Sequence, residues 1–182
     1  MNIEKKELRK AISLAKKGLS PESKLLSSEI ACRSLMSDPH VLYATIIAAY
    51  WPLQDEIDVR PVIRWAVASG KTVYLPVMNG DDLDLRLFSG EDLLNSDNSY
   101  HVSQPVDAPL LSNTTGLGMT MIIPGMAFDS LGNRLGRGRG FYDRMLKRFP
   151  AAYKIGVAFS VQHAPSVPIG LMDVPMDSVL FA

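Results

Sequence analysis

The chain has 182 residues, of which 47% are apolar and 21% charged, so it can bury one substantial core and lacks the charge content of a disordered protein. Its 19 basic and 19 acidic residues balance, which excludes a global field that recruits nucleic acid or an anionic membrane. The single cysteine, Cys32, excludes an internal disulfide framework, and no stretch approaches the roughly 20 apolar residues of a membrane span. We expect a single cytoplasmic domain over residues 1–182.

In chain order, two helices come first. Residues 2–17 place apolar and basic side chains with the period of a helix, which Gly18 ends. Ser20 and Pro21 are typical of a helix start, because serine caps the helix and proline loses no hydrogen bond in the first turn. This second helix is expected to reach Met36.

Apolar strands alternate with short helices in the rest of the chain. Continuous apolar runs predict buried strands at residues 43–50, 71–77, 119–123 and 153–159, with a last short strand at 178–181. Helices are expected at 58–68 and 140–149, a more exposed strand at 85–88, and little regular structure at 89–116. This order predicts an α/β fold, a three-layer sandwich around a mostly parallel β-sheet, Rossmann-like in architecture. Ligands of such sheets bind beyond the carboxyl ends of strands, where residues 51–58, 124–143 and the segment after Phe159 fall.

The most informative segment runs from Asp129 to Arg144 and has a glycine at every second position from 136 to 140. Glycine permits positive φ, so the backbone N–H groups can turn inward as an anion nest, and a helix N-terminus follows. The guanidinium groups of Arg134, Arg137 and Arg139 suit phosphate oxygens, and Asp143 can hold a divalent ion. Together these features predict a polyphosphate site.

Two better-known glycine motifs do not match this sequence. Gly70-Lys71-Thr72 ends like a phosphate-binding P-loop, but Trp65 occupies the position of the required earlier glycine, and the order is helix to strand. Residues 136–140 lack the Rossmann glycine spacing. A solvated surface turn or a weak RNA-binding segment stays open, although the position between a strand and a helix favours phosphate binding.

Residues 124–144 resemble the signature of the 5-formyltetrahydrofolate cyclo-ligase family. Weaker likenesses occur in the same order: residues 5–9 resemble its basic first helix, 53–58 its motif after the first strand, and 175–177 its C-terminal element. The resemblance implies conversion of 5-formyltetrahydrofolate and ATP to 5,10-methenyltetrahydrofolate, ADP and phosphate, with Mg²⁺. In that reaction the formyl oxygen attacks the γ-phosphate and N10 then displaces the phosphate on ring closure. Such phosphoryl transfer needs positioning and charge neutralisation more than a protein nucleophile.

The resemblance also implies the site residues. The catalytic residues would be Arg137, Arg139 and Asp143, and the magnesium ligands Asp143 and Asp177. The nucleotide would contact Lys5, Lys6, Arg9, Arg134, Leu135, Gly136, Arg137, Gly138, Arg139, Gly140, Phe141 and Tyr142. The folate would contact Trp51, Glu56, Arg137, Gly138, Arg139, Gly140 and Phe141. Glu56 suits the two adjacent N–H donors of a pterin, and Trp51, which by itself favours a core position, could stack on the ring.

The sequence departs from the family pattern at two positions. Phe141 stands where many relatives carry tyrosine, and Met172 replaces a histidine that often precedes the aspartate at Asp173. The histidines His40, His101 and His163 match no motif and are expected to be structural or exposed.

Two rival functions stay open. One is a fold relative that binds a phosphorylated metabolite without hydrolysing ATP, and the other is an RNA-associated module built on residues 134–144. The balanced charge weighs against RNA. We expect a monomer whose substrate is 5-formyltetrahydrofolate, with or without a polyglutamate tail, and which has no stable nucleic-acid partner and no membrane association.

Overall fold

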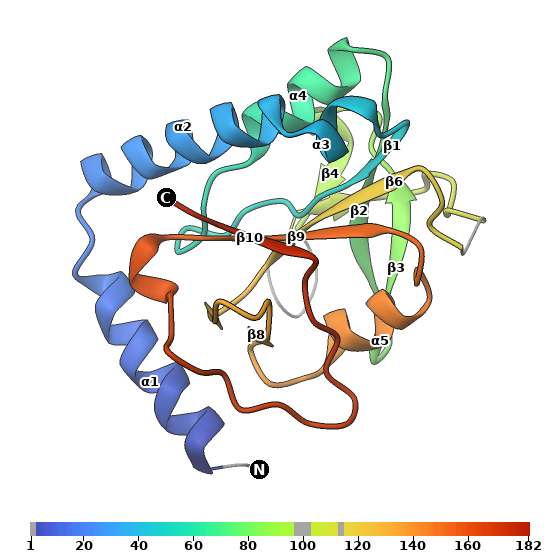
Figure 1. The fold of residues 1–182 in the computed structure, drawn as a ribbon. Coiled ribbons are helices and arrows are strands. Elements are labelled where there is room, and N and C mark those ends of the chain that lie inside the picture. Colours follow the sequence, from blue (N-terminus) through green and yellow to red (C-terminus); the bar gives the residue numbers. More distant parts are fainter. Residues whose placement is uncertain (1–2, 97–102, 113–114) are drawn as a thin grey trace.

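The fold is built on a six-stranded sheet with helices on both faces (Figure 1). This computed structural model describes residues 3–96, 103–112 and 115–182. The strand order is β10-β9-β6-β1-β2-β3, and all neighbouring pairs are parallel except β2 and β3, which are antiparallel. The strands are β1 (Ile46–Ala48), β2 (Thr72–Asn79), β3 (Asp82–Leu87), β6 (Met119–Pro124), β9 (Tyr153–Ala158) and β10 (Ser178–Phe181). The expectation of an α/β fold with a mostly parallel sheet is confirmed.

The helices form the two outer layers. Figure 1 places α2 (Pro21–Ser37), α3 (Pro39–Tyr43) and α4 (Arg60–Ala68) on one side of the sheet. On the other side lie α1 (Ile3–Lys17) and α5 (Phe141–Lys147). Within the described ranges, no helix combines the length and the apolar character that a bilayer span requires.

Local capping explains where α2 and α3 begin. The Ser20 side chain accepts a hydrogen bond from the backbone N–H of Ser23 at 3.1 Å, with Pro21 in the first turn, as predicted. Asp38 caps α3 in the same way, accepting from the N–H of His40 at 2.7 Å. The prediction of a strand from residue 43 is therefore wrong at its start, because Asp38 and Pro39 begin a short helix that includes Tyr43.

The core lies on both faces of the sheet. Leu35, Ile63 and Phe159 are buried on the side of α2 and α4, whereas Phe128 and Phe149 are buried on the side of α5. Each such side chain stabilises the fold by about 1.5–3 kcal/mol relative to an exposed one. Every residue of β6 is buried, as expected of a central parallel strand.

Residues 89–116 contain more regular structure than predicted. A 3₁₀ turn, η1 (Glu91–Leu93), precedes a short antiparallel pair formed by β4 (Leu94–Asn95) and β5 (Gln104–Pro105). The expectation for residues 97–102 and 113–114, and for His101, lies outside the described residues. The isolated bridge between Arg86 and Leu110 attaches this segment to β3.

A small hairpin that the sequence did not predict precedes the glycine–arginine segment. It pairs β7 (Ala127–Phe128) with β8 (Arg134–Leu135), and the Asp129 carboxylate holds its turn by accepting the N–H groups of Leu131 and Asn133, both at 3.0 Å. Gly132 has φ +82°, and a Cβ there would lie 2.3 Å from the carbonyl oxygen of Met176. Only glycine fits this contact with the C-terminal segment.

Candidate active site

A cavity of about 590 Å³ opens at the carboxyl ends of β1, β2 and β6. This is the edge at which ligands of parallel sheets bind, and the volume is that of a small-molecule site. Three parts of the chain supply most of its wall: α1, the segment between β1 and α4, and the glycine–arginine segment.

Most of the residues predicted for the site line this cavity. Lys5, Arg9, Trp51, Glu56 and the continuous run 134–143 all contribute to its wall. Two predicted residues do not. Lys6 is exposed on α1, and Asp177 accepts the backbone N–H of Lys154 at 2.7 Å at the start of β9, away from the cavity.

Positions 136, 138 and 140 of the glycine–arginine segment require glycine for different structural reasons. Gly138 and Gly140 have φ values of +111° and +68°, the left-handed region that turns backbone N–H groups toward a ligand. Gly136 has no positive φ, but a Cβ there would approach the Nη1 of Arg134 at 3.0 Å. Arg9 donates from Nε to the carbonyl oxygen of Gly136 at 2.8 Å, which fastens α1 to the segment.

Arg134 and Asp143 form a buried ion pair on the cavity wall. The Arg134 Nη2 lies 3.0 Å from Asp143 Oδ1, and the two side chains are only 3% and 14% exposed. The guanidinium also lies 5.3 Å from the centre of the Tyr142 ring. Its Nε is buried with no hydrogen-bond partner among the described residues, which leaves one N–H of this cation unsatisfied.

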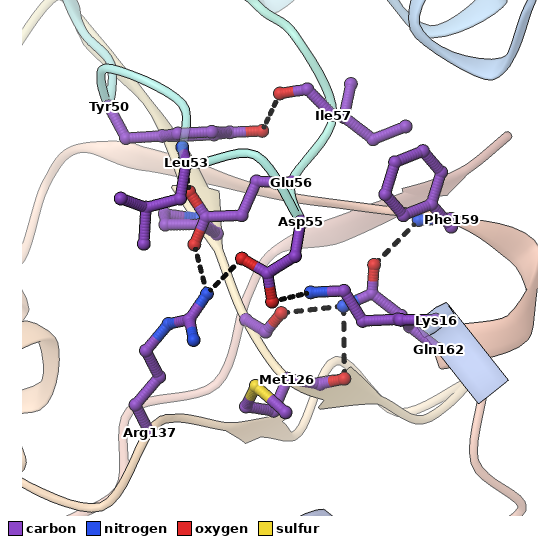
Figure 2. Close-up of polar contacts among 12 residues, drawn as sticks. Lys16, Tyr50, Leu53, Asp55, Glu56, Ile57, Met126, Arg137, Phe159 and Gln162 are labelled. Carbon is purple, nitrogen blue, oxygen red and sulfur yellow. Dashed lines mark hydrogen bonds and ion pairs between the residues drawn. The ribbon is translucent and has the colours of Figure 1, made fainter. Parts of the chain in front are cut away.

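Arg137 makes a second, more exposed set of contacts across the cavity (Figure 2). Its Nη2 lies 2.8 Å from Asp55 Oδ1 and 3.1 Å from Glu56 Oε1. The other Asp55 oxygen accepts Lys16 Nζ of α1 at 2.8 Å. Burial by itself would raise the pKa of Asp55, but Lys16 and Arg137 outweigh it and lower that pKa.

Asp173 also lines the cavity and was not predicted as a site residue. It forms an ion pair with Lys5 and accepts the N–H of Gly170 at 2.8 Å. Burial acts to raise its pKa, but Lys5 and the Gly170 N–H outweigh it, so the pKa is lowered. The sequence offered one signal for this role, because the family pattern has an aspartate at this position, directly after the residue at which Met172 departs from it.

Another part of the cavity wall, here called its apolar end, carries mainly apolar side chains. It is lined by Trp51, Pro76, Met78 and Leu83, with Gln104 beside them. Trp51 also packs against Phe88 at 5.9 Å, so it belongs to both the core and the cavity. Glu56 lies beside Arg137, with Oε1 3.1 Å from its Nη2, and Oε2 accepts the N–H of Leu53 at 3.0 Å, which fixes the carboxylate.

Two further side chains, those of Gln162 and Arg144, stabilise the backbone around the cavity. The buried Gln162 donates from Nε2 to the carbonyl oxygens of Gly125 (2.7 Å) and Met126 (3.0 Å), beyond the end of β6 (Figure 2). Arg144 donates to the carbonyl oxygen of Arg139 at 3.0 Å and pairs with Asp82 at 2.6 Å. The Arg144 contacts tie the glycine–arginine segment to the start of β3, and the Gln162 contacts hold the turn that follows β6.

Of the histidines that the structure describes, neither His40 nor His163 lines the cavity. His40 stacks on Tyr153 at 3.5 Å, and His163 contacts Ser130 and the ring of Phe181. His101 lies outside the described residues.

The donors of the cavity fit a magnesium ion that arrives with phosphates. Among the described residues, no three His, Cys, Asp or Glu side chains gather as a complete metal site. Mg²⁺ usually takes one or two carboxylates together with substrate phosphates and water. Asp143 fits this role as a single protein ligand, whereas Asp177 is placed elsewhere.

Comparisons with known proteins agree along the whole chain. A model of the 5-formyltetrahydrofolate cyclo-ligase family matches residues 2–182. The chain is 29% identical to the 5-formyltetrahydrofolate cyclo-ligase of Mus musculus, over 100% of this chain and 95% of that protein. It is 31% identical to the enzyme of the same name from Escherichia coli strain K12, over 91% of this chain and 93% of that protein.

Solved structures show the same likeness. The 5,10-methenyltetrahydrofolate synthetase of Aquifex aeolicus superposes with a TM-score of 0.84 at 30% identity, covering 97% of this chain and 89% of that one. The synthetase of Mycoplasma pneumoniae, at 21% identity and a TM-score of 0.75 over 97% and 98% of the two chains, shares the fold. The chain thus belongs to the 5-formyltetrahydrofolate cyclo-ligase family.

Proposed function

We propose that this protein converts 5-formyltetrahydrofolate and ATP to 5,10-methenyltetrahydrofolate, ADP and phosphate. One observation carries the proposal beyond family membership. A single cavity joins a cation-rich end, formed by Lys5, Arg9 and residues 134–143, to an apolar end, and the carboxylate of Glu56 lies in its wall beside Arg137. This arrangement suits a polyphosphate beside a heterocycle with N–H donors.

The reaction needs a formyl oxygen made into a leaving group. That oxygen attacks the γ-phosphorus, the bond to the ADP oxygen breaks, and N10 then attacks the formyl carbon and expels phosphate. The charge that develops on the phosphoryl oxygens calls for fixed donors rather than a nucleophile. Arg137, Arg139 and the backbone N–H groups near Gly138 and Gly140 supply such donors, and Lys5 and Arg9 bind the remaining phosphates.

Magnesium has one proposed protein ligand. Mg²⁺ would neutralise the phosphates, and the Asp143 carboxylate would hold it from the cavity wall. Arg134, paired with Asp143 at 3.0 Å, fixes the direction of that carboxylate. We do not extend this role to Asp177, nor phosphate binding to Lys6, because neither side chain lines the cavity.

The folate end would recognise the pterin by one carboxylate and by shape. Glu56 accepts the pterin 2-amino group and N3–H, while Trp51, Met78 and Phe141 contact the ring. Phe141 offers a stacking surface without the hydroxyl that many relatives have at this position.

The proposed function extends to the organisation of the chain and to its compartment. We propose that residues 1–182 act as one domain and as a monomer, since the cavity draws on residues from Lys5 to Asp173 of one chain. A reducing cytoplasm suits the buried thiol of Cys32. Arg134 and Arg137 turn toward the cavity carboxylates Asp143 and Glu56, which favours a nucleotide over RNA as the ligand of this segment.

Purified protein tests the proposal directly. We expect the methenyl chromophore to grow from 5-formyltetrahydrofolate only when both ATP and Mg²⁺ are present. Omission of ATP, and separately chelation of Mg²⁺, serve as controls. Absence of the chromophore at every nucleotide concentration would exclude the cyclo-ligase reaction and favour a fold relative that only binds phosphorylated metabolites.

A further inference from the structure

Asp55 stands just outside the cavity yet contacts one of its principal cations. It does not line the cavity, whereas its neighbour Glu56 and its partner Arg137 both do. Asp55 and Arg137 are 82 residues apart in sequence and 2.8 Å apart in space (Figure 2). Asp55 falls within residues 53–58, which resemble a family motif, but the resemblance assigned it no role.

We propose that Asp55 is a positioning residue, which holds the Arg137 guanidinium at the cavity wall while Glu56 engages the folate. The inference rests on the proposed cyclo-ligase activity. Arg137 divides one nitrogen, Nη2, between the two neighbouring carboxylates. A pterin that donates two hydrogen bonds to Glu56 competes for the same oxygens, so Glu56 alone would release Arg137 when the substrate binds.

Asp55 is suited to this role because its own carboxylate is fixed. One oxygen accepts Arg137, and the other accepts Lys16 Nζ of α1 at 2.8 Å. The Lys16 side chain is only 3% exposed, whereas that of Asp55 is 43% exposed. A buried ammonium keeps its partner in place, because its release would leave an unpaired charge out of water. Asp55 therefore holds Arg137 from a point that the ligand does not contact.

Charge neutralisation is the central demand of phosphoryl transfer, so a displaced guanidinium should reduce turnover more than binding. The Asp55→Asn variant keeps the shape of the side chain and removes its charge. We expect kcat to fall about 10-fold, with a smaller change in the folate KM. The same variant leaves Lys16 buried without its anion, so its Tm should also fall.

A double variant separates positioning from stability. In Asp55→Asn/Lys16→Met the unpaired ammonium is gone, so we expect Tm to return toward that of the wild type. Turnover should stay about 10-fold low, because Arg137 still lacks its anchor. If kcat recovers together with Tm, Asp55 serves only as the partner of Lys16, and the proposal is wrong.

A cycle with Arg137 tests whether Asp55 acts through that residue. We expect Arg137→Ala to lower kcat about 100-fold, and Asp55→Asn to cost less than about twofold more in that background. A full second 10-fold loss there would show that Asp55 acts independently and would overturn the inference. Absence of methenyl product from the wild type would instead remove the proposed function, and the inference with it.

Asp58→Asn is the matched control for charge. Asp58 belongs to the same loop, pairs with Arg60 at 2.5 Å and lies outside the cavity wall. Asparagine keeps its acceptor for the N–H of Arg60. We expect kcat within about twofold of the wild type. An equal loss in this control would assign the effect of Asp55→Asn to the lost charge itself, against the proposal.

Discussion

The two ends of the cavity are assembled in different ways. The cation-rich end comes mainly from one continuous stretch, residues 134–143, joined by Lys5 and Arg9 of α1. The apolar end is collected from residues distant in sequence, among them Trp51, Met78 and Gln104. A contiguous end can be recognised as a motif, whereas a dispersed end exists only once the sheet has formed.

The two ends also differ in what holds their side chains in position before a ligand binds. At the cation-rich end Arg134 pairs with Asp143, Arg137 with Asp55, and Lys5 with Asp173. Phosphates that bind there must compete with these carboxylates, which gives the protein a way to hold cations in place without a ligand. Ligand recognition at the apolar end depends on the shape of the wall and on the nearby carboxylate of Glu56. Variants at the first end should therefore change turnover, and variants at the second should change folate affinity.

The largest effect is expected at Asp143. Asp143→Asn keeps an acceptor for Arg134 but removes the charge that would hold Mg²⁺. We expect kcat to fall about 100-fold, since a charge-stabilising contact of the transition state is lost. Initial rates across a Mg²⁺ titration, with Tm measured in parallel, check this. A variant that turned over normally at ordinary Mg²⁺ concentrations would place the metal at another site.

A smaller and more selective effect is expected at Glu56. Glu56→Gln replaces one acceptor by a donor that faces the pterin N–H groups, so the folate KM should rise about 10-fold. The nucleotide KM should change little, because Asp55 still holds Arg137. Steady-state kinetics with each substrate varied in turn measure both values. An unchanged folate KM would move Glu56 out of the folate end.

The smallest effect on catalysis is expected at Lys71. Its Nζ donates to the carbonyl oxygens of Leu42 (2.6 Å) and Ala44 (2.7 Å), at the amino end of β2 and on the edge of the sheet opposite the cavity. Lys71→Ala should keep kcat and both KM values near wild type while costing about 1 kcal/mol of stability. Thermal unfolding and initial rates together check this, and a large loss of turnover would falsify our rejection of the P-loop interpretation.

Much of the fold could be predicted because its signals are local. Apolar runs and the Ser20-Pro21 start gave the buried strands and α2 within a few residues. The hairpin of β7 and β8 was missed because each strand has only two residues, and its turn depends on the Asp129 carboxylate. Tyr43 is misassigned because its side chain continues the apolar run of the next strand. In the structure it is the last residue of the short helix that Asp38 caps.

The same distinction between local and non-local signals applies to the residues of the site. The glycine–arginine segment was recognisable, but Asp55 and Asp173 were not, because their partners Arg137 and Lys5 lie 82 and 168 residues away. Asp177 was expected beside Asp143. The structure places it at the amino end of β10, whereas the cavity opens at the carboxyl ends of the parallel strands. The strand expected at 178–181 put Asp177 before its first residue, but the sequence does not show that this strand runs parallel to β9.

The way in which α1 is attached should couple nucleotide affinity to the docking of this helix. Of its 15 residues only Ile12 and Lys16 are buried, so apolar packing holds α1 weakly. Much of its attachment comes from cations, with Arg9 bound to Gly136 and Lys16 to Asp55. A ligand that binds only the docked helix stabilises docking by mass action. If the nucleotide contacts Lys5 and Arg9 as proposed, part of its binding free energy goes into keeping α1 docked. A substitution on the solvent face of α1 that loosens the helix should then weaken nucleotide affinity without contacting the ligand.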